Sequence, residues 1–132
     1  MAVVDTCFLI DLMRGRPGAV ALLTDLEGRR EPLKVPSIVL HELHRGLAAA
    51  RLPADERLRV AAAIAGKPVL VYGAEAAVAG GTLDGALSRR GKRLDPEDCM
   101  IAATALTEGD ELVTRDGGIV TKVAGLRLLT YA

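Results

Sequence analysis

Short apolar runs alternate with longer amphipathic stretches along the whole chain. The short runs have the length of strands, with KPVLVYG as the clearest buried one, and they lie at residues 2–5, 33–37, 67–73, 111–116 and 126–131. The stretches between them repeat apolar residues at helical spacing, which predicts helices over residues 6–15, 16–30, 38–52, 54–66, 74–90 and 96–109. Strands that alternate with helices predict an α/β fold, a central, mostly parallel and twisted sheet with helices on both faces.

Turn and cap residues support these boundaries. Ser37 is expected to cap the helix that follows it, because a serine there accepts a hydrogen bond from a free backbone N–H. The glycine pair at 80–81 is expected to loosen its helix. Asp95 and Gly109 have the residue types of an N-cap and a helix stop.

The chain has 132 residues, of which 17 are basic and 17 acidic, so its formal net charge is zero. A polyanionic partner must therefore be held by a local patch or through a metal ion, not by overall charge. No apolar stretch approaches the length of a membrane span and the N-terminus has no signal-peptide pattern, so a soluble cytoplasmic protein is expected. The complete lack of Asn and Gln is typical of thermophile proteins.

Two cysteines, Cys7 and Cys99, are too few for a disulfide framework, and no Cys/His spacing indicates zinc. Both are expected to be small buried hydrophobic residues. A disulfide between them stays open, because intracellular thermophile proteins do contain disulfides.

Acidic residues stand at positions where the predicted fold would bring them together. Asp5 and Asp116 end two strands, and parallel strands present their carboxyl ends at one edge of the sheet. Asp98 lies in the first turn of a helix, on its inward face, and Glu42 interrupts an otherwise apolar helix. Converging carboxylates repel one another unless a cation lies between them, and Mg²⁺ or Mn²⁺ prefers such oxygen ligands.

Each acid also has an ordinary structural interpretation. The three aspartates could serve as a cap, a first-turn acid and a turn residue, and Glu42 could pair with Arg45 one turn later. Asp11 is expected to be structural and bonded near Arg14. His41 and His44 flank the glutamate but are not expected to act as general bases.

Four segments of the chain, VVDT, PSIVLHELHRG, EDCMIAATAL and LVTRD, occur in the order found in a known family. Together they resemble the PIN-domain ribonucleases, especially the VapC-type toxins of prokaryotic toxin–antitoxin pairs. The resemblance covers residues 1–132 as a single PIN domain. It implies that Asp5, Glu42, Asp98 and Asp116 hold one or two Mg²⁺ or Mn²⁺ ions.

The resemblance also implies supporting roles and one departure. The hydroxyls of Thr6 and Thr114 are expected to support the metal-binding carboxylates. Many relatives carry a further acid where this chain has Ile119, so a second metal site is in question.

By this resemblance the chain is an endoribonuclease toxin that hydrolyses RNA phosphodiesters with metal-activated water. A small VapB-type antitoxin and a second copy of the chain are the implied protein partners. Contact with the RNA backbone is a hypothesis for the basic residues Arg14, Arg16, Arg89, Arg90, Lys92 and Arg93. The alternatives are a housekeeping RNA-processing or decay nuclease without an antitoxin, and a noncatalytic RNA- or phosphate-binding module, including a receiver-like phosphoacceptor.

Overall fold

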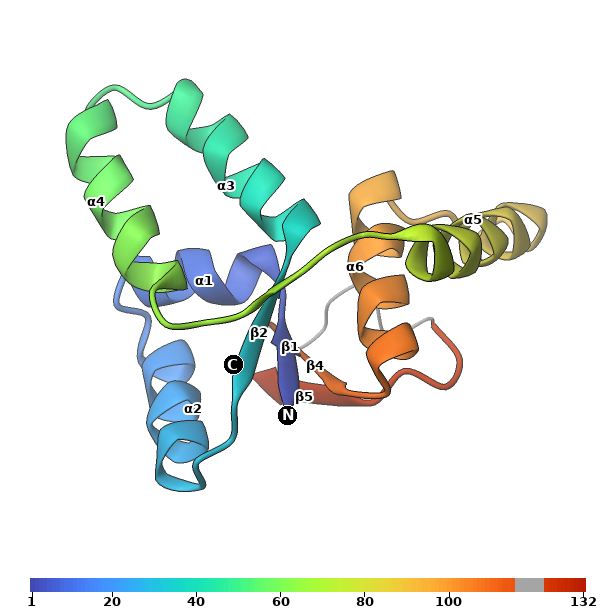
Figure 1. The fold of residues 1–132 in the computed structure, drawn as a ribbon, viewed down its shortest axis with the longest axis horizontal. Coiled ribbons are helices and arrows are strands. Elements are labelled where there is room, and N and C mark those ends of the chain that lie inside the picture. Colours follow the sequence, from blue (N-terminus) through green and yellow to red (C-terminus); the bar gives the residue numbers. More distant parts are fainter. Residues whose placement is uncertain (116–122) are drawn as a thin grey trace.

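The computed structural model describes residues 1–115 and 123–132, so the predicted site residue Asp116 and the departure at Ile119 lie outside the described residues. Five strands form one sheet in the order β3-β2-β1-β4-β5, and every pairing is parallel. The predicted α/β fold is thus confirmed (Figure 1). The strands are β1 (Ala2–Val4), β2 (Leu33–Pro36), β3 (Val69–Leu70), β4 (Glu111–Arg115) and β5 (Leu128–Tyr131).

The central strand β1 is short, apolar and fully buried, as expected for a strand covered on both faces. It pairs with β2 on one side and with β4 on the other, where Val4 lies opposite Val113. The main core forms around it from residues such as Val3, Phe8 and Leu112, which are completely buried. This packing fixes where β1 ends and therefore where the next residue, Asp5, is placed.

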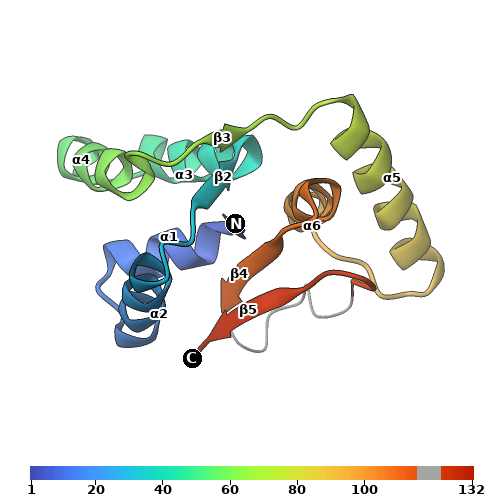
Figure 2. The ribbon, with the colours of Figure 1, turned by 60° about the horizontal axis from the view of Figure 1, so that its bottom comes forward.

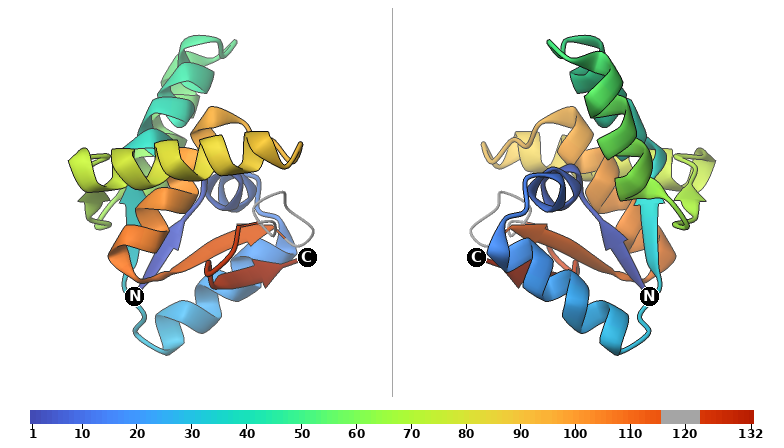
Figure 3. Two further views of the ribbon diagram at one scale, coloured as in Figure 1. Left: turned by 90° about the vertical axis from the view of Figure 1, so that its right-hand side faces the viewer. Right: turned by 90° about the vertical axis from the view of Figure 1, so that its left-hand side faces the viewer.

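In the described residues, six helices pack around the sheet. They are α1 (Thr6–Met13), α2 (Pro17–Gly28), α3 (Ser37–Ala48), α4 (Pro53–Ile64), α5 (Ala74–Arg89) and α6 (Pro96–Glu108). Helices α1 and α2 lie on one side of the sheet and α5 and α6 on the other, while α3 and α4 form a projecting pair (Figures 2 and 3). In the described part of the chain, no helix combines the length and apolar character needed to span a membrane.

The prediction of a well-buried strand at 67–73 is wrong in extent and environment. Only Val69 and Leu70 form β3, which pairs with β2 alone at the edge of the sheet. Val69 is 45% exposed and Val71 78% exposed. An apolar run indicates a strand, but it does not reveal whether that strand has neighbours on both sides.

The predicted cap at Ser37 is also wrong. Ser37 is the first residue of α3, and no side chain caps this helix. Its hydroxyl instead accepts a hydrogen bond from the backbone N–H of Tyr72, at 3.1 Å. The serine therefore ties the start of α3 to the segment that follows β3.

The glycine pair does not interrupt α5, which runs without a break from Ala74 to Arg89. Gly80 is buried where α5 packs on α6, and a Cβ there would collide with the hydroxyl of Tyr72 and lie 3.4 Å from the Cβ of Ala103. A Cβ on Gly81 would meet nothing within 4 Å. Only the first glycine is required by packing.

Asp11 of α1 is completely buried and binds groups from the C-terminal strands. Arg115 donates to both of its carboxylate oxygens, at 2.7 and 3.0 Å, and the Tyr131 hydroxyl donates at 2.6 Å. Arg16 adds an ion pair at 3.3 Å. The predicted structural role fits this geometry, but the predicted neighbour Arg14 is not the partner, because the bonds come from residues more than 100 positions away.

We expect Asp11→Asn to lower the free energy of unfolding by about 2–3 kcal/mol, because it removes the buried negative charge that binds the Arg115 guanidinium. Asp25→Asn is a matched control, since its pair with Arg29 at 2.8 Å is exposed and should be worth less than about 1 kcal/mol. Urea unfolding at pH 7 measures both. Equal losses in the two variants would contradict a special role for the buried carboxylate.

The two glycines of α5 predict opposite effects for the same substitution. Gly81→Ala should raise the free energy of unfolding by about 0.5–1 kcal/mol, because alanine favours a helix and finds open space. Gly80→Ala should lower it by about 1–3 kcal/mol, because Tyr72 must move. Thermal unfolding of the two variants checks the sign, and a stabilised Gly80→Ala protein would show that α5 and α6 have room to separate.

Candidate active site

The order of the strands reverses between β1 and β4, and in parallel sheets the crevice at such a point lies beyond the carboxyl ends of the strands. Asp5 is the residue that follows β1 there, and its backbone N–H donates to the carbonyl of Val113, at 3.2 Å. Its Oδ1 accepts a hydrogen bond from the N–H of Phe8, at 2.8 Å, and caps α1. Because this cap uses one carboxylate oxygen, Asp5 can cap the helix and bind a ligand as well.

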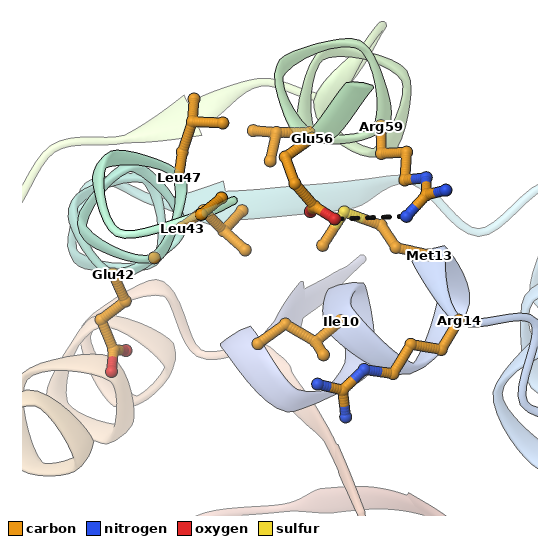
Figure 4. Close-up of a pocket in the computed structure, with 11 residues that line it drawn as sticks. Ile10, Met13, Arg14, Glu42, Leu43, Leu47, Glu56 and Arg59 are labelled. Carbon is orange, nitrogen blue, oxygen red and sulfur yellow. Dashed lines mark hydrogen bonds and ion pairs between the residues drawn. The ribbon is translucent and has the colours of Figure 1, made fainter. Parts of the chain in front are cut away.

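Two further acids reach this crevice from different helices. Asp98 lies in the first turn of α6, and Glu42 projects from α3 on the side away from Leu47 (Figure 4). The Thr6 hydroxyl donates to Oε1 of Glu42, at 2.7 Å, which joins the start of α1 to α3. Thr6 therefore holds one oxygen of Glu42 in place, and its expected support of a metal-binding carboxylate stays a prediction.

The acids are close enough to perturb one another. Burial raises the pKa of Asp5 to about 6, and the negative charge of Asp98 adds to the rise, while Thr114 and the Phe8 N–H act against it. The pKa of Asp98 is also raised, first by burial and then by the charge of Glu42. Asp98 thus lies within electrostatic reach of Asp5 and of Glu42, and the fourth predicted acid, Asp116, lies outside the described residues.

The chemistry of this donor set fits a hard divalent cation. Three carboxylates offer oxygen ligands, and their mutual repulsion would be relieved by positive charge. Within residues 1–115 and 123–132, no group of three or more His, Cys, Asp or Glu side chains is arranged so that it could hold an ion by itself. The predicted ligand set includes Asp116 as well, so its geometry is not fully described.

The remaining predicted residues occupy varied places. Thr114 is buried in β4 beside Asp5. Arg14 lines a pocket of about 280 Å³ between α1, α3 and α4, which Glu42 also borders (Figure 4). Arg16 is paired with Asp11. The other predicted RNA contacts are all exposed. They lie at the end of α5 and in the loop before α6, and they are Arg89, Arg90, Lys92 and Arg93.

Sequence reasoning missed one contact at the edge of the site. It considered Arg45 only as a partner of Glu42, and that pair exists at 3.6 Å. Arg45 also binds Glu97, at 3.2 Å, and so joins α3 to α6. The 52 positions between the two residues leave no local signal from which this pair could have been predicted.

The cysteines are both free, so no disulfide joins them. Cys99 is buried as predicted, but the prediction was wrong for Cys7, which is exposed. The reason is its place on α1. Phe8, Leu9 and Asp11 are the buried residues of that helix, and Cys7 in its first turn is not among them.

Comparison with known proteins supports the same fold. The family model described as PIN domain matches residues 2–126. No curated protein matches the chain significantly by sequence.

Solved structures resemble the chain over nearly its full length. A chain of VapBC2 from Rickettsia felis bound to a DNA fragment from their promoter has a TM-score of 0.89 at 20% identity and covers 99% of this chain and 98% of that one. DNA-bound VapBC from Salmonella typhimurium gives a TM-score of 0.88 at 26% identity, covering 98% and 96%. VapBC-5 from Mycobacterium tuberculosis gives 0.74 at 22%, covering 98% and 96%.

The raised pKa of Asp5 predicts a pH dependence of stability in metal-free protein. Because the folded pKa of about 6 exceeds the unfolded value of about 3.9, this group favours folding below pH 4, and the contribution is lost as the pH rises to 6. Asp5→Asn keeps the cap and removes the charge, so in EDTA at pH 7 it should raise the free energy of unfolding by about 1–2 kcal/mol. Urea unfolding between pH 4 and 7 measures this. The exposed Asp95→Asn is the control, and a less stable Asp5→Asn protein at pH 7 would contradict the assigned environment.

Proposed function

The chain belongs to the PIN-domain family, and on that premise we propose that it is a Mg²⁺- or Mn²⁺-dependent endoribonuclease, the toxin of a toxin–antitoxin pair. PIN domains are generally nucleases. The observation that supports the proposal is the placement of Asp5, Glu42 and Asp98 on three separate elements, with Asp98 in electrostatic reach of the other two, near the point where the strand order reverses. Residues gathered from distant segments into one acidic crevice are typical of a site rather than of chance surface charge.

The proposed roles follow the placement of each side chain. Asp5, Glu42 and Asp98 would bind the metal together with Asp116. The Thr6 hydroxyl binds Oε1 of Glu42, so the other oxygen, Oε2, would be the one that binds the metal. Thr114, buried beside Asp5, would support that carboxylate in the same way.

When bound, one or two Mg²⁺ or Mn²⁺ ions would supply an acidified water for attack on the phosphorus and positive charge for the leaving 3′ oxygen. The products would be a 5′-phosphate and a 3′-hydroxyl. The chain itself needs to provide only a fixed set of carboxylates and a rigid floor. The buried strand β1 and the capped start of α1 supply that floor.

The partner proposal rests on the structural relatives. Because those structures are of VapBC assemblies, we expect a small VapB-type antitoxin to inhibit this chain. The pocket between α1, α3 and α4 presents Ile10, Met13 and Leu47 beside Glu42, which suits an apolar peptide segment that ends at the acids. Homodimer formation and a cytoplasmic location, where an RNA substrate is found, belong to the same proposal.

The central test is metal-dependent cleavage. Purified protein with Mn²⁺ or Mg²⁺ should cut single-stranded RNA, EDTA should abolish the cutting, and Asp98→Asn should reduce the rate by at least about a hundredfold while the protein stays folded. Gel analysis of end-labelled RNA measures the rate and identifies the ends. Asp95→Asn, an exposed acid three residues earlier, should cut at the wild-type rate.

Four results would redirect the proposal. Cleavage that persists in EDTA would overturn the metal mechanism, and full activity in Asp98→Asn would show that the site is assigned wrongly. RNA binding without any cleavage would favour the noncatalytic binding module. Cleavage in a protein whose gene has no antitoxin neighbour would favour a housekeeping nuclease.

A further inference from the structure

Arg45 joins the two helices that carry Glu42 and Asp98. One nitrogen of its guanidinium, Nη1, lies 3.2 Å from Oε1 of Glu97 on α6, and the other, Nη2, lies 3.6 Å from Oε2 of Glu42 on α3. Glu97 is the residue directly before Asp98. A positive charge is therefore fixed at the edge of the acidic crevice by two of the acids that border it.

The pairing of Glu42 is divided between two partners. Its Oε1 accepts from Thr6, at 2.7 Å, whereas among the described residues its Oε2 has the longer contact with Arg45, at 3.6 Å. The side chain of Glu42 is 18% exposed and that of Arg45 is 59% exposed. Oxygen Oε2 is thus the one that a cation can take over, and the guanidinium has solvent on its outer side.

An RNA phosphodiester is an anion, and three carboxylates at the site would repel it. Exposed ion pairs such as those of Arg45 contribute little to stability, so the guanidinium can change partners at small cost. Arginine also binds phosphate oxygens in a two-pronged geometry that lysine does not reproduce. Arg45 has the charge, the exposure and the location for such an exchange.

We propose that Arg45 exchanges the Glu42 carboxylate for a phosphodiester of the RNA substrate: it neutralises Glu42 in the free protein and binds RNA when Glu42 turns to the metal. This inference rests on the proposed function. It adds a substrate-binding residue and a direct link between metal binding and RNA binding. Glu97 keeps the guanidinium at the crevice during the exchange.

The exchange predicts opposite effects of one substitution on two ligands. Arg45→Ala should tighten Mn²⁺ binding about two- to fivefold, because Glu42 loses a competing cation. The same variant should raise the half-saturating RNA concentration about five- to twentyfold with kcat within about threefold of wild type, because a charged hydrogen bond to the substrate is lost. Arg45→Lys keeps the positive charge but loses the two-pronged guanidinium. Its Mn²⁺ affinity should therefore lie close to the wild-type value, whereas its RNA affinity should stay weaker than wild type.

Two measurements test this. Calorimetric titration with Mn²⁺ alone gives the metal affinity, and cleavage of a labelled single-stranded RNA in Mn²⁺ gives kcat and the half-saturating concentration. Arg29→Ala is the matched control, because it removes an exposed arginine from a helical ion pair with Asp25 on α2. Thermal unfolding confirms that each variant is folded.

The outcomes separate this inference from the proposed function. If wild type cleaves RNA and Arg45→Ala changes neither affinity, or lowers kcat alone, Arg45 forms only a structural ion pair and the inference is wrong. If Arg45→Ala binds RNA more tightly than wild type, Arg45 hinders RNA binding and the inference is wrong. If wild type does not cleave RNA in Mn²⁺, the proposed function fails and this inference fails with it.

Discussion

The buried carboxylate of Asp11 is the interaction on which the arrangement of this fold depends most. A carboxylate without solvent is costly unless charged and hydrogen-bonded partners surround it. Here Arg115 from β4 and Tyr131 from β5 supply those partners, so α1 cannot leave the sheet without exposing an unpaired charge. Because Asp5 begins α1 and Arg115 ends β4, the same contact fixes the distance between the two sides of the crevice.

Two carboxylates at opposite ends of one short helix therefore have opposite environments. Burial would raise the pKa of Asp11, but Arg115 and Tyr131 hold it below its ordinary value. The pKa of Asp5 is raised instead, because the effect of burial exceeds the opposing effects of Thr114 and the Phe8 N–H, and the charge of Asp98 adds to the rise. Such separation of pKa values distinguishes a structural acid from one kept for chemistry. The protein neutralises the first acid internally and leaves the second to be neutralised by something that binds.

The sequence predicted the parts of this arrangement that depend on order along the chain. Asp5 ends an apolar run, so the rule for parallel strands was sufficient to place it at the carboxyl edge of the sheet, and helical periodicity placed Asp98 in the first turn of its helix. Contacts between distant side chains were not accessible in this way. Arg14 is a basic neighbour of Asp11 in the sequence, yet Asp11 binds Arg115, 104 positions away, because the folded sheet brings those two residues together. The exposure of the edge strand β3 was mispredicted for a related reason, since a strand's neighbours are set by topology and not by its own composition.

Under the proposed function, the electrostatics of the whole chain would couple metal binding and RNA binding. Because the net charge is zero, no overall field draws a polyanion to the protein, and the crevice itself carries negative charge. In the proposed exchange, a divalent cation would change the sign of that local field and, by binding Glu42, would free the guanidinium of Arg45 at the edge of the crevice. Each ligand then improves the affinity for the other by the same factor, as linkage requires. A protein partner with a cationic side chain would be attracted by the same negative charge. Inhibition and catalysis would then depend on the same carboxylates.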